Sequence, residues 1–217
     1  MARGRFITLE GGEGAGKSTH IRHLAAWLQG QGIEVVATRE PGGTEGAENI
    51  RRLIVEGSVD RWDGLTETLL LNAARRDHVE RLIAPALARG AWVLCDRYVD
   101  STLVYQGTAK GVGLDTLLQL HALATGPLWP DLTLVLDLPP AVGLARAAGR
   151  ASGLAAGQAG AETRFEDHAI EFHEKLRQGF LELAERFADR CAVVDASAPM
   201  EQVSGAIETV VRERLGL

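Results

Sequence analysis

The glycine-rich segment from Gly11 to Ser18 constrains the fold of this chain more than any other stretch. It reads GGEGAGKS and matches the pattern G-x-x-x-x-G-K-[ST]. An apolar run at 6–9 precedes it, and apolar residues at helical spacing follow over 21–28. A phosphate-binding loop requires this order of strand, glycine-rich loop and helix, whereas a glycine-rich turn without a ligand does not.

The residue types of this segment suit the binding of a nucleoside triphosphate. Glycines adopt backbone conformations closed to residues with a Cβ, so successive N–H groups can surround a phosphate. Lys17 adds a positive charge near the β and γ phosphates, Ser18 supplies a hydroxyl to Mg²⁺, and the following helix points its positive dipole end at the anion. The residues expected to contact ATP here are Gly11, Gly12, Glu13, Gly14, Ala15, Gly16, Lys17, Ser18 and Thr19.

Strand-like runs alternate with helical segments along the chain. The hydropathy pattern predicts strands at 6–9, 34–38, 92–95, 132–138 and 192–194, and further helices at 47–56, 66–89, 114–124, 142–150, 165–188 and 200–215. We expect a polar loop and a helix start at 98–113, and Pro85 can kink or end the helix that contains it. This alternation predicts an α/β fold with a five-stranded parallel sheet wrapped by helices, in a single domain over 1–217.

The composition argues against several classes of protein. A net charge of −6 disfavours broad binding to nucleic acids or anionic membranes, so phosphate recognition must come from local arginine clusters. Cys95 and Cys191 lie in apolar runs, which suits buried thiols in a reducing compartment better than a disulfide or zinc site. The first strand starts by Arg5, which leaves no room for a signal peptide, and no segment has the apolarity of a membrane span. We therefore expect a cytoplasmic protein.

Charged residues follow two of the predicted strands. Arg39 and Glu40 open a turn-rich loop, and Asp96 and Arg97 follow the apolar run at 92–95. Ligands bind at the carboxyl edge of α/β sheets, which favours ligand contact over simple solvation. Asp96 is placed like a Walker B carboxylate that binds Mg²⁺, and Arg97 offers a planar fork for phosphate oxygens. A surface ion pair between the two is the alternative, although adjacent strand side chains point to opposite faces.

The segment 151–161 contains no charge and consists almost entirely of small residues, which indicates flexibility. Flanked by Arg150 and Arg164, it fits a mobile lid over about 146–164 that brings cations onto a bound nucleotide. A dispensable linker is the alternative. The core of the domain would then comprise 1–145 and 165–217.

The sequence lacks the motifs of several nucleotide-hydrolysing proteins. It contains neither the N-K-x-D and D-x-x-G motifs of GTPases nor the L-S-G-G-Q signature of ABC-type ATPases. One phosphate-binding loop, arginines at loop ends and a candidate lid instead favour a kinase that passes the γ-phosphoryl group to a small molecule. A non-catalytic nucleotide-binding regulator is the alternative, and the presence of Lys17, Asp96 and Arg97 argues against it.

Four motifs, in this order, resemble those of bacterial thymidylate kinases. They are Glu10-Gly11 to Thr19, Thr38-Arg39-Glu40-Pro41-Gly42-Gly43-Thr44, Ala73-Ala74-Arg75, and Asp96-Arg97-Tyr98-Val99-Asp100-Ser101-Thr102 through Tyr105-Gln106-Gly107. The similarity extends over nearly the whole chain. It implies a P-loop nucleoside monophosphate kinase fold, transfer of the γ-phosphoryl group of ATP to dTMP to give dTDP and ADP for dTTP synthesis, Mg²⁺ as cofactor, and a homodimer.

The resemblance also implies roles for the phosphate-binding side chains. Lys17 would hold the phosphates of ATP, and Ser18 and Asp96 would organise Mg²⁺. Arg97 would grip the phosphate of dTMP, and Glu13 would face the acceptor sugar near its 3′-hydroxyl.

On the nucleoside side, the resemblance implies that Arg75 bonds the thymine edge and that Arg51 and Gln106 border the base. Thr102 and Tyr105 would line the nucleoside pocket, with Tyr105 disfavouring a 2′-hydroxyl. The complete set of expected dTMP-binding residues is Glu13, Arg39, Glu40, Arg51, Leu71, Arg75, Arg97, Thr102, Tyr105 and Gln106.

The transition-state arginine is expected to come from the lid. Position 13 is Glu and the phosphate-binding loop contains no arginine, as in the family type whose lid carries that residue. Arg150 is the first candidate, with Arg146 and Arg164 behind it. Cations around the equatorial oxygens favour phosphoryl transfer, and a closed lid excludes water that would hydrolyse ATP.

Two departures from the family pattern stand out. Leu71 occupies the position, four residues before the base-binding arginine, where family members often carry a stacking Phe. Stacking of a base on an aromatic ring is worth roughly 1–3 kcal/mol, so we expect weaker or less selective monophosphate binding. The lid is also longer and richer in Gly and Ala than the compact, arginine-dense lids of this type. A kinase for another nucleoside monophosphate therefore stays an alternative.

Overall fold

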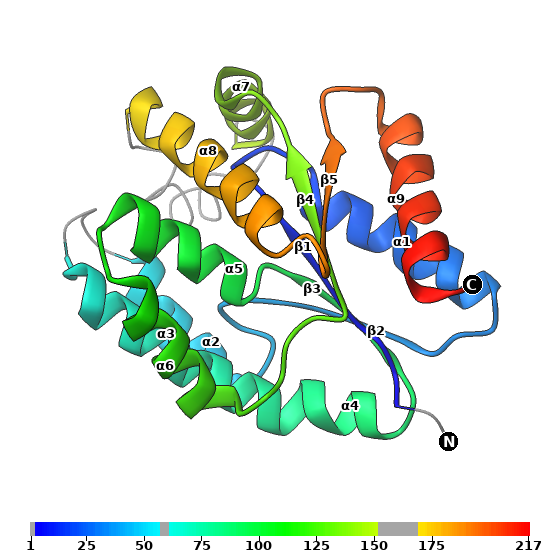
Figure 1. Ribbon diagram of the computed structural model, residues 1–217, viewed down its shortest axis with the longest axis horizontal. Coiled ribbons are helices and arrows are strands. Elements are labelled where there is room, and N and C mark those ends of the chain that lie inside the picture. Colours follow the sequence, from blue (N-terminus) through cyan, green and yellow to red (C-terminus); the bar gives the residue numbers. More distant parts are fainter. Residues whose placement is uncertain (1–2, 57–60, 152–168) are drawn as a thin grey trace.

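The five predicted strands form one parallel sheet. A computed structural model provides the structure of the chain, and it describes residues 3–56, 61–151 and 169–217. The sheet has the strand order β2-β3-β1-β4-β5 (Figure 1). The strands are β1 (Phe6–Glu10), β2 (Val35–Arg39), β3 (Trp92–Asp96), β4 (Leu132–Asp137) and β5 (Cys191–Asp195). The phosphate-binding loop thus follows the central strand, and β3 and β4 flank that strand on either side.

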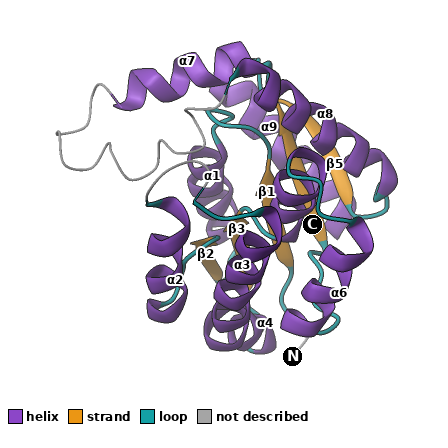
Figure 2. Ribbon diagram, turned by 90° about the vertical axis from the view of Figure 1, so that its left-hand side faces the viewer, coloured by secondary structure: helices purple, strands orange, loops and turns teal. Residues whose placement is uncertain are grey.

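Helices enclose the sheet on both faces, as Figures 1 and 2 show. They are α1 (Lys17–Gly30), α2 (Glu45–Val55), α3 (Gly64–His78), η1 (Val79–Ile83), α4 (Ala84–Ala88), α5 (Val99–Thr102), η2 (Leu103–Ala109), α6 (Leu114–Thr125), α7 (Pro140–Ala151), α8 (Ile170–Arg186) and α9 (Met200–Leu215). The helix predicted at 66–89 is observed as α3, η1 and α4 in direct succession. The π-helical turn η1 immediately precedes α4, whose first turn contains Pro85, so the type of helix changes next to the proline that is expected to kink or end it.

The loop predicted at 98–113 is wrong for most of its length, because α5 and η2 make the chain helical from Val99 to Ala109. Leu103, Val104 and Tyr105 are buried, and η2 packs against α8. Tertiary packing of these side chains outweighs the polar and glycine content that suggested a loop.

Alternation along the strands divides the core into two layers. In β1, Phe6 belongs to the cluster beneath α4, η2, α6 and α8, whereas Ile7 and Leu9 belong to the cluster beneath α1 and α9. Successive strand side chains point to opposite faces, so a fully apolar strand is buried on both sides. The free thiols of Cys95 and Cys191 are buried, as predicted.

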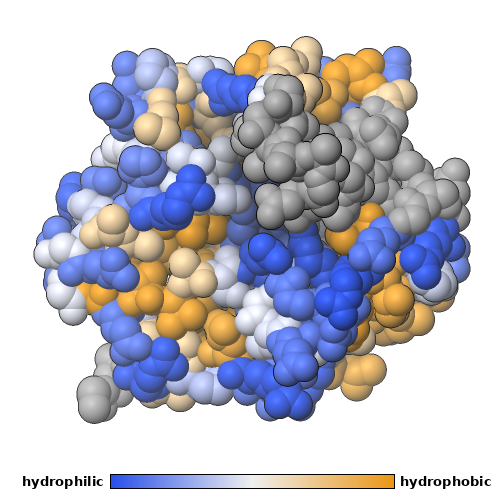
Figure 3. All heavy atoms as spheres, turned by 180° about the vertical axis from the view of Figure 1, so that it is seen from behind, coloured by the Kyte–Doolittle hydropathy of each residue, from blue (hydrophilic) through white to orange (hydrophobic). Residues whose placement is uncertain are grey.

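On the face seen in Figure 3, hydrophilic residues surround scattered hydrophobic ones. Among the residues that the structure describes, no helix combines the length and apolarity needed to cross a membrane. Most of the predicted lid, including Arg164, and the side chain of Arg150 lie outside the described part of the chain.

Candidate active site

A pocket of about 440 Å³ lies at the carboxyl edge of the sheet. Its lining comes from the phosphate-binding loop, the ends of β2 and β3, and helices α1, α2, α3, α5 and η2. The predicted site residues among this lining are Glu13, Gly14, Gly16, Lys17, Ser18, Thr19, Arg39, Glu40, Arg51, Leu71, Arg75, Asp96, Arg97, Thr102, Tyr105 and Gln106. Residues that are far apart in the sequence therefore meet at one edge, as the strand pattern predicts.

Two glycines give the phosphate-binding loop its shape. Gly14 has φ 71°, and a Cβ at that position would lie 1.9 Å from the carbonyl oxygen of Gly143 at the start of α7. Gly16 has φ 89° and forms the N-cap of α1. Because glycine has no side chain to cap the helix, the N–H groups of Lys17 and Ser18 at the start of α1 remain available to an anion, whereas the Thr19 N–H donates to Gly16 O.

The ammonium group of Lys17 lies over the loop that carries it. Its Nζ donates hydrogen bonds to the carbonyl oxygens of Gly11 (3.1 Å) and Gly12 (2.9 Å). Burial, together with the charge of Arg97, lowers the pKa of Lys17. A buried ammonium group whose hydrogen bonds go to carbonyl oxygens is well suited to an incoming phosphate, which would supply full negative charge.

Ser18 and Asp96 form a pair of oxygen ligands beside the loop. Ser18 Oγ donates a hydrogen bond of 2.5 Å to Asp96 Oδ2. A hydroxyl next to a carboxylate suits Mg²⁺, which takes few ligands from protein and the rest from phosphate and water. Within the described ranges no cluster of three or more His, Cys, Asp or Glu side chains is arranged to hold a metal ion.

Asp96 and Arg97 have different hydrogen-bond partners among the described residues, which agrees with the sequence-based preference over a surface ion pair. Arg97 has φ 68°, a left-handed conformation that is costly for a side chain with a Cβ. Its Nη2 donates to Glu13 Oε1 (2.6 Å), and its Nη1 donates to Ser101 Oγ (3.1 Å) and Gly11 O (3.2 Å). The guanidinium is thereby held at the mouth of the loop.

The Glu13 carboxylate connects Arg97 with Tyr105. Tyr105 donates its hydroxyl proton to Glu13 Oε1 at 2.9 Å, and Arg97 lies over the ring of Tyr105 at 5.0 Å. Burial would raise the pKa of Glu13, but the charges of Arg97 and Lys17 and the Tyr105 hydrogen bond lower it to about 2. Glu13 is therefore charged at neutral pH and can accept further hydrogen bonds.

Arg75 is fully buried at the inner end of the pocket. Its Nε donates to Glu40 Oε2 (2.7 Å) and its Nη2 donates to Thr102 Oγ1 (3.0 Å). His78 Nδ1 lies 3.0 Å from Glu40 Oε1. Burial would raise the pKa of Glu40, but Arg75 and His78 lower it. Arg75 Nη1 has no hydrogen-bond partner among the described residues, although it is buried.

Other predicted site residues have local partners. Arg39 pairs with Glu48 at 3.0 Å, and Arg51 Nη1 donates to Pro41 O at 2.7 Å. Arg146 Nη1 donates to Ala196 O at 3.1 Å, and Arg146 is not part of the pocket lining.

Sequence reasoning missed four buried or partly buried groups that hold the site. Glu10 accepts hydrogen bonds from the Tyr98 N–H (2.7 Å) and Ser101 Oγ (2.6 Å). His78 and Glu67 contact residues of the pocket lining, and Lys110 pairs with Glu67. The scarcity of lysine is the one signal that singles out Lys110, because the chain has three lysines in total. Glu67 and Lys110 are not near one another in sequence, so no local pattern reveals their pairing.

The comparisons with known proteins agree with this geometry. The model of the thymidylate kinase family matches residues 9–207. The thymidylate kinase of Caulobacter vibrioides is 52% identical over 217 residues, which is 100% of both chains, and that of Jannaschia sp. is 50% identical over 97% of both chains. A crystal structure of thymidylate kinase from Ehrlichia chaffeensis superposes with a TM-score of 0.77 at 30% identity, covering 96% of this chain and 99% of that one. The five-stranded parallel sheet, the phosphate-binding loop and these matches together establish that the chain belongs to the thymidylate kinase family.

Proposed function

We propose that the pocket at the carboxyl edge of the sheet holds dTMP next to the phosphate-binding loop, with the side chains in the roles described below. The reaction is that of the family: the protein transfers the γ-phosphoryl group of ATP to dTMP and yields dTDP and ADP. The observation that carries the proposed pose is a pair of buried atoms without partners in the described chain, Arg75 Nη1 and Gln106 Oε1, on two pocket-lining residues.

These two atoms complement thymine. Arg75 Nη1 is a hydrogen-bond donor and Gln106 Oε1 is an acceptor. Thymine presents the O4 acceptor next to the N3–H donor, so both groups would be satisfied on binding. Cytosine reverses the two functions, which would leave buried polar groups unpaired at a cost of about 1–3 kcal/mol each. Leu71 also lines this pocket and supplies an apolar contact where a ring would stack.

The acceptor phosphate and sugar would lie between Arg97 and Tyr105. Arg97 is a preorganised fork for the dTMP phosphate, and the charged Glu13 carboxylate can accept a hydrogen bond from the 3′-hydroxyl. Tyr105 is held by its bond to Glu13, and a fixed ring beside the sugar would leave little room for a 2′-hydroxyl. Arg39, Glu40, Arg51 and Thr102 complete the proposed set.

The donor side would use the first-turn amides of α1 together with Lys17, which would exchange its carbonyl partners for ATP phosphates. Ser18 and Asp96 would hold the Mg²⁺ that accompanies ATP in this family. That ion supplies charge neutralisation of the phosphates. Lid arginines would surround the transferred group, and Arg150, with Arg146 and Arg164 as alternatives, stays a sequence-based prediction for that role.

We also propose a homodimer in the cytoplasm. Leu65 and Leu69 on α3 are 47% and 50% exposed, and Leu123 on the adjoining α6 is 82% exposed. Apolar side chains of this size on two helices in contact suit a surface that a second copy covers. Sedimentation equilibrium should give twice the chain mass, and the double variant Leu69→Glu/Leu123→Glu should give the chain mass. A wild-type chain that sediments as a monomer would contradict the proposed dimer.

A coupled ADP-release assay tests the function and the pose. With ATP and Mg²⁺, turnover should be largely confined to dTMP among dTMP, dUMP, dCMP and dGMP. Arg75→Ala should lower kcat/KM for dTMP by tenfold or more, whereas Arg89→Ala, which changes an exposed arginine in an ion pair with Glu34, should not. Equal turnover of another monophosphate would reassign the acceptor, and the absence of any acceptor-dependent ADP release would contradict the kinase and indicate a nucleotide-binding regulator.

A further inference from the structure

A buried ion pair lies behind the glutamine that borders the proposed base site. Glu67 on α3 is completely buried, and both of its carboxylate oxygens lie 3.0 Å from Lys110 Nζ. Lys110 directly follows η2, and its side chain is 18% exposed. Gln106 Nε2 donates to Glu67 Oε1 at 2.7 Å. A buried carboxylate is costly unless it is paired and hydrogen-bonded, and here Glu67 has both kinds of partner.

This arrangement fixes which end of the Gln106 amide faces away from Glu67. The two ends of a glutamine amide are almost equal in size, so packing alone does not choose between them. A carboxylate can only accept, so the NH₂ end of Gln106 must face Glu67. The carbonyl end is left over, and Oε1 is the buried atom for which the described chain offers no hydrogen-bond partner.

We infer that Glu67 and Lys110 are positioning residues that fix Gln106 as a hydrogen-bond acceptor and thereby select acceptor nucleotides whose pyrimidine carries an N3–H. Thymine and uracil have this proton, and cytosine has a lone pair in its place. The inference rests on the proposed location of the base beside Gln106 and Arg75. Neither Glu67 nor Lys110 is part of the pocket lining, so both act through Gln106.

Reversing the ion pair should reverse the amide. In the double variant Glu67→Lys/Lys110→Glu, the group that faces Gln106 becomes an ammonium, which only donates. Gln106 must then turn its carbonyl toward position 67 and present its NH₂ end to the base. That end opposes the N3–H of thymine and can donate to N3 of cytosine.

The test measures kcat/KM for dTMP and dCMP by ADP release. For Glu67→Gln, whose amide can donate or accept, Gln106 can take both orientations, and the dTMP to dCMP ratio should fall about tenfold. The reversed pair should lower it further while keeping opposite charges at the two positions. KM for ATP should stay within about twofold in both variants, because neither residue borders the phosphate-binding loop.

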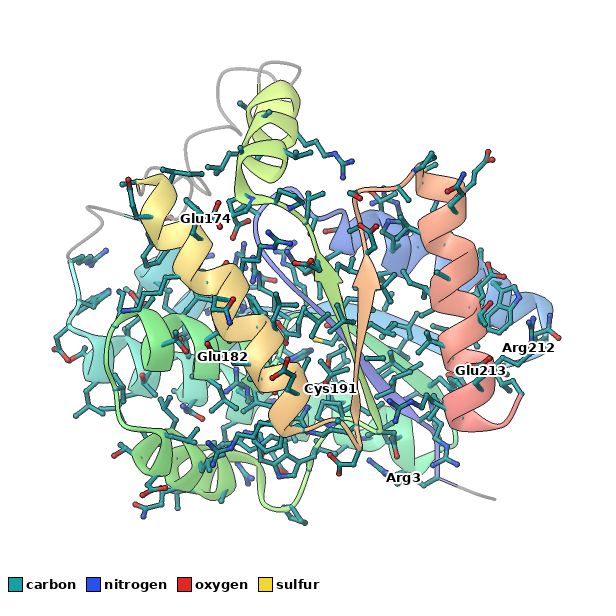
Figure 4. The ribbon with its side chains drawn as sticks, turned by 45° about the horizontal axis from the view of Figure 1, so that its top comes forward. Arg3, Glu174, Glu182, Cys191, Arg212 and Glu213 are labelled. Atoms are coloured by element: carbon teal, nitrogen blue, oxygen red, sulfur yellow. The ribbon has the colours of Figure 1, made fainter. Side chains whose placement is uncertain are left out.

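Asp131→Asn is a matched control that shows whether lower stability alone changes the dTMP to dCMP ratio. Asp131 accepts from the Phe6 N–H at 2.7 Å and pairs with Arg3, which Figure 4 places near the amino end of β1. This variant should lower Tm without changing the dTMP to dCMP ratio. A ratio unchanged in both Glu67→Gln and the reversed pair, with normal circular dichroism, would overturn the inference. Gln106→Ala separates that result from a failure of the proposed pose, because an unchanged ratio in Gln106→Ala places the base elsewhere.

Discussion

Replacing Glu40 by glutamine should be among the most destabilising single-atom changes in the protein. The side chains of Glu40, Arg75 and His78 are 4%, 2% and 0% exposed, respectively. Glutamine keeps the shape, and His78 can change its tautomer to match the new amide, because Nε2 then donates to Thr38 Oγ1 at 2.8 Å. What Glu40→Gln removes is the charge that neutralises the buried guanidinium. Removing one charge of a buried ion pair lowers the free energy of unfolding by about 3–5 kcal/mol.

Urea unfolding followed by fluorescence of the four tryptophans measures this cost. Glu213→Gln is the control, because Glu213 lies exposed in the last turns of α9 (Figure 4) and its change should stay within about 0.5 kcal/mol. The double variant Glu40→Gln/Arg75→Met lacks both charges. Its loss in free energy of unfolding should therefore be about 2 kcal/mol smaller than the sum of the losses in the two single variants. Additive losses, or a loss below about 1 kcal/mol for Glu40→Gln, would refute the reasoning.

The Glu40 carboxylate also makes the contribution of the Glu40–Arg75 pair to the free energy of unfolding depend on pH. The pKa of Glu40 is lowered in the folded state, so its contribution to the free energy of unfolding is complete above the ordinary pKa of glutamate, about 4.3, and is lost as the pH falls below it. Between pH 5 and pH 3 the wild type should therefore lose more stability than Glu40→Gln. KM for dTMP should also rise in this variant, because Arg75 loses the bond that orients it.

Three further changes test other parts of the structure. Gly14→Ala should abolish ATP binding, measured by isothermal titration calorimetry, because its Cβ would lie 1.9 Å from Gly143 O; retained affinity would contradict the close packing of loop and α7. Thr44→Ala should lower the free energy of unfolding by about 1 kcal/mol, since it removes the N-cap of α2. Burial and the charge of Arg75 lower the pKa of His121 to about 4. Between pH 6.5 and pH 4 the wild type should therefore lose up to about 3 kcal/mol more of its free energy of unfolding than His121→Gln loses. Equal losses in the two proteins would refute this.

The sequence predicts the sheet well because its strands are buried on both faces. Continuous apolar runs such as 92–95 leave few alternatives, and the charged residues or turn formers that follow the strands mark the edge where ligands are expected to bind. The helical state of 99–109 could not be predicted in this way. Its apolar side chains become a buried face only when α8, more than 60 residues later in the chain, packs on them. Local pattern carries no information about such a distant partner.

The residues of the candidate site also differ in how far the local sequence pattern predicts them. Lys17 and Asp96 could be predicted from local pattern, because a loop and a strand end define their positions, and the structure places both in the pocket lining. The resemblance predicts Arg75 as a site residue, but neither it nor the local pattern predicts that Glu40 holds the Arg75 side chain. Glu40 contacts Arg75 across 35 positions, and Glu67 contacts Gln106 across 39, so each pairing depends on how α3 is placed against β2 and η2.

These pairings also explain how a chain with a net charge of −6 can build an anion site. Three of the proposed recognition groups of the pocket have an internal carboxylate: Glu40 for Arg75, Glu13 for Arg97, and Glu67 behind Gln106. A guanidinium that is already neutralised and bonded loses little side-chain freedom when a ligand arrives, so less binding energy is spent on ordering it. The carboxylate also weakens the attraction for phosphate in general. A ligand must therefore match the remaining donor and acceptor atoms, which makes geometry, more than charge, the basis of selection in this pocket.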